Sequence, residues 1–253
     1  MSFVTLRGHR IEVEGIGATR PGAPSLIFLH EGLGSVALWR DFPAKLAAAT
    51  GAAAVVYSRY GYGKSDPIAK PYAPDYMHKE ALEALPELRE KLGIENPILI
   101  GHSDGASIAL IHAGAARWPV RALILEAPHV FVEDVTIASI EAAKETYRST
   151  DLRARLCRYH ADPDNAFWGW NDIWLHPDFR RWNIEDVLPG VRCPVLAIQG
   201  ADDEYGSLAQ LDAIERGVGG PFERLELPRC KHSPHRDQEA ATLAAMAAFI
   251  ARV

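Results

Sequence analysis

The stretch at residues 97–116, PILIGHSDGASIALIHAGAA, constrains the fold more than any other part of the sequence. A short apolar run is followed by the pentapeptide Gly-His-Ser-Asp-Gly and then by small residues in a helical pattern. This order predicts a strand, a sharp turn and a helix, with Ser103 on the turn and its hydroxyl projecting into a cleft. The five residues alone are also typical of an ordinary turn serine between glycines, so other parts of the chain are needed to distinguish a catalytic serine from a turn residue.

Buried strands and helices alternate along most of the chain. The first two strands expected, at 3–6 and 10–14, alternate polar and apolar residues and predict a half-exposed antiparallel pair. The next four, at 25–29, 53–57, 122–125 and 194–198, are mostly apolar, as in strands buried on both faces. The last strand is expected at 222–227. Helices are expected after Ser103 and at 39–50, 77–92, 208–216 and 237–250, with a kink or break at Pro86. The pattern predicts an α/β fold with a largely parallel sheet covered on both sides.

One segment, residues 131–189, has no convincing buried strand. It contains a helical stretch at 137–147 and a tryptophan-dense part with four tryptophans, Trp168, Trp170, Trp174 and Trp182. Such a long insertion at the carboxyl end of a sheet is typical of a lid or binding element. We therefore expect a core made of residues 1–130 and 190–253 and a helical cap at 131–189. The alternative is a helical insertion without a binding role, whose tryptophans pack only into the hydrophobic core.

Composition and charge exclude several classes of protein. A net charge of −6 and a pI near 5.9 give no electrostatic footprint for nucleic acid or an anionic membrane. Charges appear by the seventh residue and no run of 18 apolar residues occurs, so neither a secretory signal nor a spanning helix is expected. Cys157, Cys193 and Cys230 are too few and too widely spaced for a disulfide framework or a zinc site, which favours the cytoplasm and no metal.

Two further clusters follow the ends of predicted strands. Residues 199–204 place three adjacent acids after the strand at 194–198, and residues 230–235 place His232 and His235 after the last strand. Because the carboxyl ends of parallel strands share one edge of a sheet, both clusters are expected beside Ser103. A serine hydroxyl needs a base, and the base needs an acid to fix its tautomer, so the three positions predict nucleophilic catalysis.

Nucleophilic attack also needs donors for the oxyanion. One is expected from the backbone N–H of Asp104, and another from the glycine-rich loop at 30–35, His-Glu-Gly-Leu-Gly-Ser. The same loop could cradle a phosphate, but it lacks a Lys-Ser/Thr ending and no GxGxxG follows.

Taken in order, these motifs resemble the α/β-hydrolase superfamily over nearly the full chain. The matching segments are LHEGLGS at 29–35 with Trp39 after it, YSRYGYGKSD at 57–66, GHSDGA at 101–106, PVLAIQGADDEYG at 194–206 and KHSPHRDQ at 231–238. The resemblance implies an eight-stranded, mostly parallel sheet with helices on both faces and a cap after the sixth strand.

The resemblance also implies roles for single residues. Ser103 matches the nucleophile, His232 the base and Asp203 the acid, with Asp202 as the alternative acid and His235 as the fallback base. Gly32 matches the loop donor of the oxyanion hole, with Leu33 next to it.

Two residues depart from the family pattern. Glu31 stands where many relatives have glycine, and Asp104 stands where many have an apolar residue. The backbone donors survive both changes. The two carboxylates are expected to make the pocket entrance acidic and to disfavour strongly anionic substrates.

The sequence therefore predicts a serine hydrolase that cleaves a carboxylic ester or related acyl bond of a small-molecule substrate without a cofactor. Trp168, Trp170, Trp174 and Tyr205 are expected to form an apolar wall for a hydrophobic or aromatic substrate. The nearest alternative is a carbon–carbon bond hydrolase of ring-cleavage products, which needs cations for a substrate carboxylate and finds only Arg59 and cap arginines. The sequence is also compatible with a cofactor-free perhydrolase and with a non-catalytic ligand-binding protein on the same scaffold.

Overall fold

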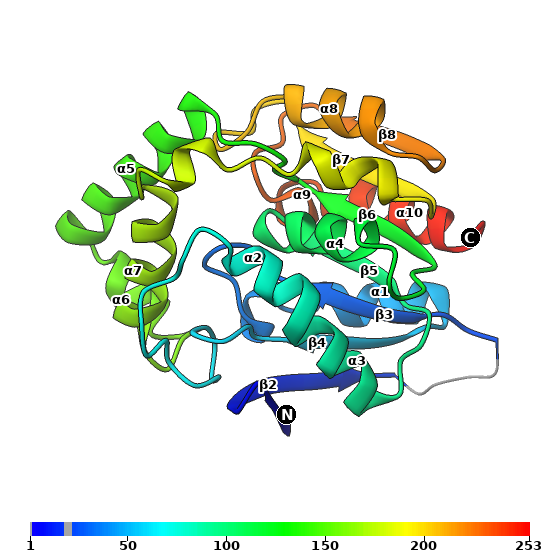
Figure 1. The fold of residues 1–253 in the computed structure, drawn as a ribbon, viewed down its shortest axis with the longest axis horizontal. Coiled ribbons are helices and arrows are strands. Elements are labelled where there is room, and N and C mark those ends of the chain that lie inside the picture. Colours follow the sequence, from blue (N-terminus) through cyan, green and yellow to red (C-terminus); the bar gives the residue numbers. More distant parts are fainter. Residues whose placement is uncertain (1, 18–21) are drawn as a thin grey trace.

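The computed structural model describes residues 2–17 and 22–253 and contains one eight-stranded sheet in the order β1-β2-β4-β3-β5-β6-β7-β8 (Figure 1). The strands are β1 Ser2–Leu6, β2 His9–Ile16, β3 Ser25–Leu29, β4 Ala53–Tyr57, β5 Ile98–His102, β6 Ala122–Glu126, β7 Val195–Gly200 and β8 Phe222–Leu227. β1 pairs antiparallel with β2 and β2 antiparallel with β4, whereas the six remaining strands run parallel. The predicted fold class, a mostly parallel eight-stranded α/β sheet, is confirmed.

Helices cover both faces of the sheet, as Figure 1 shows. The core helices are α1 Phe42–Thr50, α2 Tyr76–Lys79, α3 Leu85–Leu92, α4 Asp104–Gly114, α8 Ala209–Gly217, α9 Pro234–Asp237 and α10 Glu239–Ile250. α1 and α10 contact each other on one face, while α2, α3, α4 and α8 lie on the other.

The continuous apolar strands are explained by two separate hydrophobic cores, one on each face. Leu26 and Phe28 of β3 point into the core shared with α1 and α10, whereas Ile27 and Leu29 point into the core shared with α4. Side chains alternate across a strand, so a strand with a core on each side must be apolar at every position. β5 alternates in the same way and is fully buried, which places Ser103 at the carboxyl end of a strand between the two cores.

Two helices differ from the sequence expectation. The segment expected as one helix at 39–50 is a short 3-10 turn, Val36–Trp39, followed by α1, because Arg40 has a φ of 55° that no helix accommodates. The segment at 77–92 begins as α2, passes through one π turn at Glu80–Ala84 and continues as α3. The wider π turn lies immediately before Pro86, whose ring would clash with the preceding turn of a regular helix.

The segment between β6 and β7 is helical and lies to one side of the sheet (Figure 1). It contains α5 Asp134–Ser149, α6 Leu152–Leu156 and α7 Pro163–Trp174, then two short turns at Phe179–Arg181 and Glu185–Gly190. An isolated antiparallel bridge between Phe131 and Asn183 joins its two ends. We refer to residues 131–189 as the cap; its independence as a domain stays a prediction. Within the described ranges, no helix is long and apolar enough to cross a membrane.

Candidate active site

Ser103 lies on the tight turn between β5 and α4, with φ 53° and ψ −116°. A non-glycine residue in this region carries about 1–3 kcal/mol of backbone strain, which the surroundings must hold. Its N–H donates to the carbonyl oxygen of Glu126 at 2.9 Å, which ties the turn to the end of β6. A Cβ on Gly101 would lie 2.4 Å from the carbonyl oxygen of Gly105, and one on Gly105 would lie 2.0 Å from that of Leu29. Both glycines are therefore required by close backbone approach.

The structure brings Ser103, His232 and Asp203 into one chain of hydrogen bonds. Nε2 of His232 lies 3.0 Å from Oγ of Ser103, and Nδ1 of His232 lies 2.8 Å from Oδ1 of Asp203. The side chains of His232 and Asp203 are 13% and 1% exposed, and Ser103 is 7% exposed. The carboxylate accepts a hydrogen bond from the Nδ1–H group, which leaves Nε2 with a free lone pair toward the hydroxyl.

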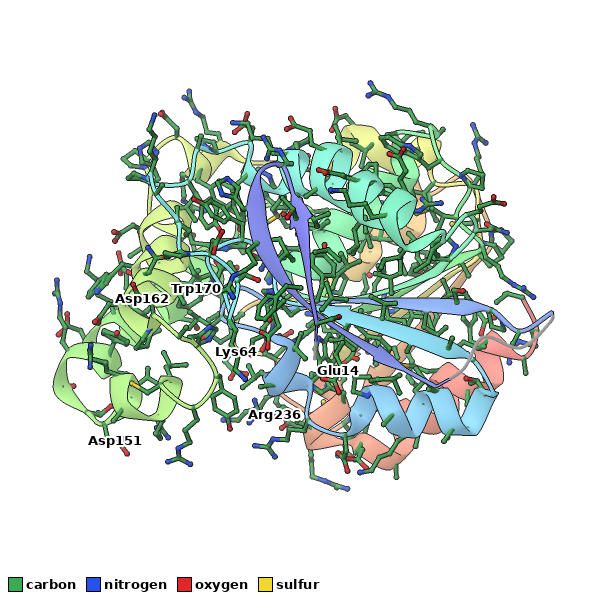
Figure 2. All side chains as sticks on the ribbon, turned by 90° about the horizontal axis from the view of Figure 1, so that it is seen from below. Glu14, Lys64, Asp151, Asp162, Trp170 and Arg236 are labelled. Carbon is green, nitrogen blue, oxygen red and sulfur yellow. The ribbon has the colours of Figure 1, made fainter. Side chains whose placement is uncertain are left out.

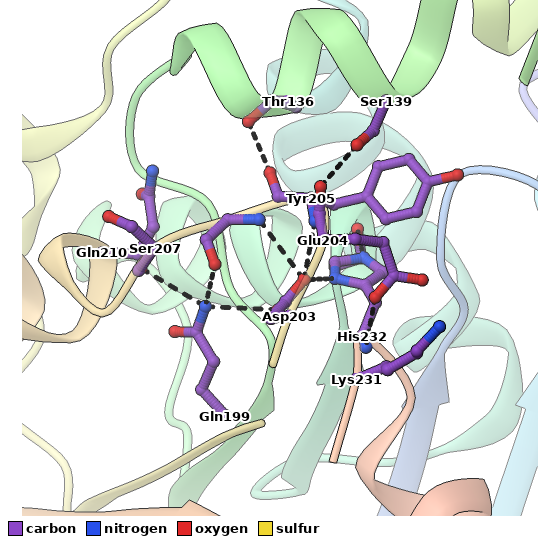
Figure 3. Close-up of polar contacts among 12 residues, drawn as sticks. Thr136, Ser139, Gln199, Asp203, Glu204, Tyr205, Ser207, Gln210, Lys231 and His232 are labelled. Carbon is purple, nitrogen blue, oxygen red and sulfur yellow. Dashed lines mark hydrogen bonds and ion pairs between the residues drawn. The ribbon is translucent and has the colours of Figure 1, made fainter. Parts of the chain in front are cut away.

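Figure 3 shows the hydrogen bonds that surround the carboxylate of Asp203. Oδ1 accepts the backbone N–H of Tyr205 at 2.8 Å, and Oδ2 accepts Nε2 of Gln199 at 3.2 Å. Burial by itself would raise the pKa of Asp203, but the charge and hydrogen bond of His232, together with the Tyr205 N–H, hold it below the ordinary value.

The alternative acid and the fallback base lie elsewhere. The side chain of Asp202 is exposed, whereas that of Asp203 meets the imidazole. His235 is buried, and its Nδ1 pairs with Oε2 of Glu126 at 2.8 Å, so its ring is engaged by another carboxylate. The geometry therefore favours Asp203 and His232 over both alternatives.

The loop after β3 is held by the carbonyl oxygen of the peptide that joins Glu31 to Gly32. The carbonyl oxygen of Glu31 accepts three hydrogen bonds, from Nδ1 of His30 at 2.6 Å, Nη2 of Arg59 at 2.9 Å and the N–H of Gly34 at 3.0 Å. The N–H of a trans peptide points opposite to its C=O, so fixing this oxygen fixes the direction of the Gly32 N–H. Glu31, Gly32 and Leu33 line the same cavity as Ser103, while the carbonyl of Leu33 accepts Nε2 of His160 from the cap.

Asp104 begins α4, so its N–H has no acceptor within the helix and is available as a donor. Its carboxylate is 1% exposed and accepts from Tyr76 at 2.8 Å, from Nε1 of Trp174 at 3.2 Å and from Arg59 at 3.3 Å. It therefore lies in a neutralised network behind the serine and does not face the cavity. The expectation that Asp104 makes the entrance acidic is corrected, because the residue forms an ion pair.

Glu31 is neutralised as well. Oε2 of Glu31 lies 3.4 Å from Nδ1 of His102, an ion pair and not a well-aligned hydrogen bond. Burial would lower the pKa of His102, but Glu31 and Glu126 raise it to about 9, and the same pairing lowers the pKa of Glu31. His102 is thus an imidazolium at neutral pH, and the second carboxylate expected to be free is also paired.

A small cavity encloses the reacting groups. Its volume is about 130 Å³. The lining includes Trp170 and Trp174 of α7, Tyr205, and Thr136 and Ile140 of α5. The Trp170 ring lies so close to the loop that a Cβ on Gly32 would be 2.2 Å from its Cδ1 and Nε1. Figure 2 shows Trp170 on the side of the cap that faces the rest of the molecule, whereas Asp151 lies at the outer end of the cap.

Trp168 does not line this cavity. It packs against Tyr147 and Phe167 and carries Lys144 and Arg148 over its ring, at 5.9 and 5.6 Å from the centroid. Residues four apart share one face of a helix, but residues two apart lie about 200° around it. The helix α7 therefore turns Trp170 and Trp174 toward the serine and Trp168 away from it.

A larger cavity of about 440 Å³ lies between the β1–β2 hairpin and α2 and shares no lining residue with the first. It contains no serine, cysteine or threonine side chain among its lining. The smaller cavity is the candidate active site because its lining contains the candidate nucleophile, Ser103, and the candidate base, His232.

Two histidines of the site, His102 and His129, were not predicted from the sequence to have a role. His102 donates from Nε2 to the carbonyl oxygen of His232 at 2.7 Å, and His129 lines the cavity beside His232. Both follow or end a parallel strand at its carboxyl edge, a signal that could have singled them out. Within residues 2–17 and 22–253, no group of three or more His, Cys, Asp or Glu side chains is arranged to hold a metal.

Comparison with known proteins identifies the family and the fold of the chain. A model of the alpha/beta hydrolase family matches residues 26–245, and the chain belongs to this family. No curated protein matches the chain. Among solved structures, VinJ has 21% identity and a TM-score of 0.78, with 99% of this chain and 98% of VinJ covered.

Two further structures share the fold. MGS-M2, an alpha/beta hydrolase enzyme from a Medee basin deep-sea metagenome library, has 17% identity and a TM-score of 0.81, covering 100% of this chain and 98% of its own. The esterase EaEST from Exiguobacterium antarcticum has 20% identity and a TM-score of 0.76, with 99% of each chain covered. At these identities the likeness extends to the fold alone.

Proposed function

We propose that the protein is a serine hydrolase that cleaves a carboxylic ester of a small, hydrophobic or aromatic molecule through an acyl-enzyme. Ser103 is the nucleophile, His232 the general base and Asp203 the residue that orients His232. The single observation that carries the proposal is the hydrogen-bond chain of 3.0 and 2.8 Å through these three side chains.

In the first half of the reaction, Oγ of Ser103 attacks the ester carbonyl while Nε2 of His232 takes its proton. The negative charge that develops on the carbonyl oxygen is stabilised by the N–H groups of Gly32 and Asp104. His232 then returns the proton to the departing alkoxide, which leaves as an alcohol.

In the second half, His232 takes a proton from water, and the hydroxide attacks the acyl-enzyme carbonyl. The tetrahedral intermediate collapses, Ser103 regains its proton from His232, and the carboxylic acid leaves. Each step moves one proton through Nε2 of His232.

The walls of the cavity support an uncharged ester as the substrate. Trp170, Trp174 and Ile140 are apolar, and the nearby carboxylates of Glu31 and Asp104 are paired with His102 and Arg59. A carbon–carbon bond hydrolase needs a cation for a substrate carboxylate. Arg59 is 2% exposed, bound to Asp104 and not part of the cavity lining, and His102, which does line the cavity, is paired with Glu31. Esters are therefore favoured over ring-cleavage products, and EaEST, which shares the fold, is itself an esterase.

The test is labelling with a fluorophosphonate probe together with hydrolysis of p-nitrophenyl esters by wild type and Ser103→Ala. We expect labelling at Ser103 and a loss of turnover of at least about a thousandfold in the variant. Ser107 lies on the same helix, and its hydroxyl is committed to the carbonyl of His129 at 2.6 Å, so Ser107→Ala serves as the control that keeps labelling.

Three outcomes contradict the proposal. An unlabelled Ser103 in folded protein supports the non-catalytic ligand-binding alternative. Equal turnover by Ser103→Ala and wild type would place the chemistry at another group. Turnover of a ring-cleavage product faster than of any ester would favour the carbon–carbon hydrolase.

A further inference from the structure

His129 is held in the cavity wall by its backbone. It follows β6 after Ala127, which is buried and has a φ of 45°. The N–H of Ala127 donates to the carbonyl oxygen of Ile198 at 2.8 Å, and the carbonyl of His129 accepts Oγ of Ser107 at 2.6 Å. Strained backbone that is fixed from both β7 and α4 is typical of a segment that positions a functional side chain.

The imidazole of His129 is 2% exposed and lines the cavity that contains Ser103. Its ring lies 5.3 Å from the ring of Trp174 and 5.6 Å from that of His232. The Nδ1 and Cε1 edge faces Gly206, where a Cβ would lie 3.5 and 3.1 Å from these atoms. Nδ1 is buried, whereas Nε2 is not among the buried polar atoms, so Nε2 is the ring nitrogen available to the cavity that His129 lines.

No described residue forms a hydrogen bond with either ring nitrogen of His129. A buried polar group without a partner carries a desolvation penalty that a leucine at the same position would avoid. Burial lowers the pKa of His129 to about 3, so the ring is neutral at ordinary pH and retains one N–H donor. The mechanism already has its base in His232 and does not use this group.

We propose that His129 determines substrate specificity by donating a hydrogen bond from Nε2 to an oxygen atom of the bound ester beyond the reacting carbonyl. The substrates preferred by the enzyme are then esters with an ether, hydroxyl or keto oxygen in the acyl or alcohol part. This inference rests on the proposed function. A neutral donor among Trp170, Trp174 and Ile140 suits an uncharged oxygen, since His102, the imidazolium in the lining, is already paired with Glu31 and is not free to bind a carboxylate.

The experiment compares esters of equal shape that differ by one oxygen in place of a methylene. The acyl-side pair is p-nitrophenyl methoxyacetate against p-nitrophenyl butanoate, together with the pair one methylene longer. The alcohol-side pair is methoxyethyl acetate against butyl acetate. For each pair, kcat/KM of the oxygen-containing ester is divided by kcat/KM of its methylene counterpart, in wild type, His129→Leu and His129→Gln. Comparing this ratio between variant and wild type cancels the intrinsic reactivity of each ester.

We expect His129→Leu to lower the ratio about threefold to tenfold in at least one pair, which is the effect of one neutral hydrogen bond. His129→Gln keeps an N–H donor and should retain part of the preference. Ile140→Leu is the matched control, since it reshapes the same cavity without a donor and should leave the ratios unchanged. Whichever pair responds identifies the side of the ester that His129 contacts.

The inference is overturned if His129→Leu changes every ratio by less than about twofold, or if Ile140→Leu changes the ratios equally. A uniform loss on both members of each pair would mean a structural role or a bound water. If His129→Leu does not fold, His129→Phe replaces it in the same comparison. Turnover that depends on Ser103 with unmoved ratios refutes only the specificity role, whereas turnover independent of Ser103 refutes the proposed function.

Discussion

Nε2 of His102 donates a hydrogen bond to the backbone carbonyl oxygen of His232 across 2.7 Å, so the residue before the candidate nucleophile holds the loop of the candidate base. The other ring nitrogen faces Glu31 of the oxyanion loop at 3.4 Å. One imidazolium therefore ties together the three segments on which the proposed chemistry depends.

This arrangement predicts a loss of stability at alkaline pH. Glu31 raises the pKa of His102 from 6.5 to about 9 in the folded protein, so the folded state retains a proton that the unfolded chain releases. The contribution of protonated His102 to the free energy of unfolding is complete below about pH 6.5 and is lost as the pH rises through about 9. The pKa difference corresponds to about 3 kcal/mol. Urea unfolding at pH 6, 7.5 and 9 should show this slope in wild type and a flatter one in His102→Gln. An identical slope in the variant would show that another group is responsible.

The choice between two adjacent acids gives the second prediction. Asp203→Asn should lower kcat by about a thousandfold to ten-thousandfold, because an amide cannot hold His232 in the required tautomer. Asp202→Asn is the matched control and should stay within about twofold of wild type, since the Asp202 side chain is exposed. Steady-state kinetics on p-nitrophenyl butanoate measures both. A larger loss in Asp202→Asn than in Asp203→Asn would reverse the assignment.

The third prediction concerns the cap tryptophans. Trp170→Leu enlarges the wall of a cavity of only about 130 Å³ and should shift the preferred acyl chain to longer members of a p-nitrophenyl series. Trp168→Leu removes a ring of the same size from the opposite face of α7 and should leave the chain-length profile unchanged. Equal shifts in both variants would mean that the profile reports the stability of the cap and not the cavity wall.

The fold could be predicted from the sequence where the local pattern is decisive. The strands at 25–29 and 53–57 have the bounds expected, because nearly every position is apolar, as a strand in a sheet with two covered faces requires. The position of Ser103 followed from the same reasoning. The different directions of Trp168 and Trp170 could also have been predicted. The Asp162 side chain accepts the N–H of Asn165 and Pro163 is the first helical residue, so the start of α7 and the face on which each later residue lies are set by the sequence.

The charges of the site could not be predicted in this way. Asp104 meets Trp174 across 70 positions of sequence and Tyr76 across 28, and no local pattern encodes either contact. A carboxylate in a sequence has no visible partner, so Asp104 and Glu31 were expected to be free. Tertiary packing supplies Arg59 and His102, and the unpaired imidazole of His129 likewise becomes visible only when its neighbours are known.

The last prediction separates the two contributions of Arg59. Asp104→Asn leaves the Arg59 guanidinium, which is 2% exposed, without its counter-charge and should lower the free energy of unfolding by about 3–5 kcal/mol. Replacing both members of the pair, Asp104→Asn with Arg59→Met, removes the buried charge and should restore much of that loss.

The kcat of the double variant should nevertheless remain below that of wild type. Arg59 also donates to the carbonyl oxygen of Glu31 at 2.9 Å, and without that bond the Gly32 N–H is less firmly directed toward the oxyanion. Urea unfolding and kcat, measured on wild type, both single variants and the double variant, distinguish the two effects. Recovery of both stability and kcat in the double variant would show that Arg59 only balances charge, whereas recovery of stability alone is the result expected if Arg59 also directs the oxyanion loop.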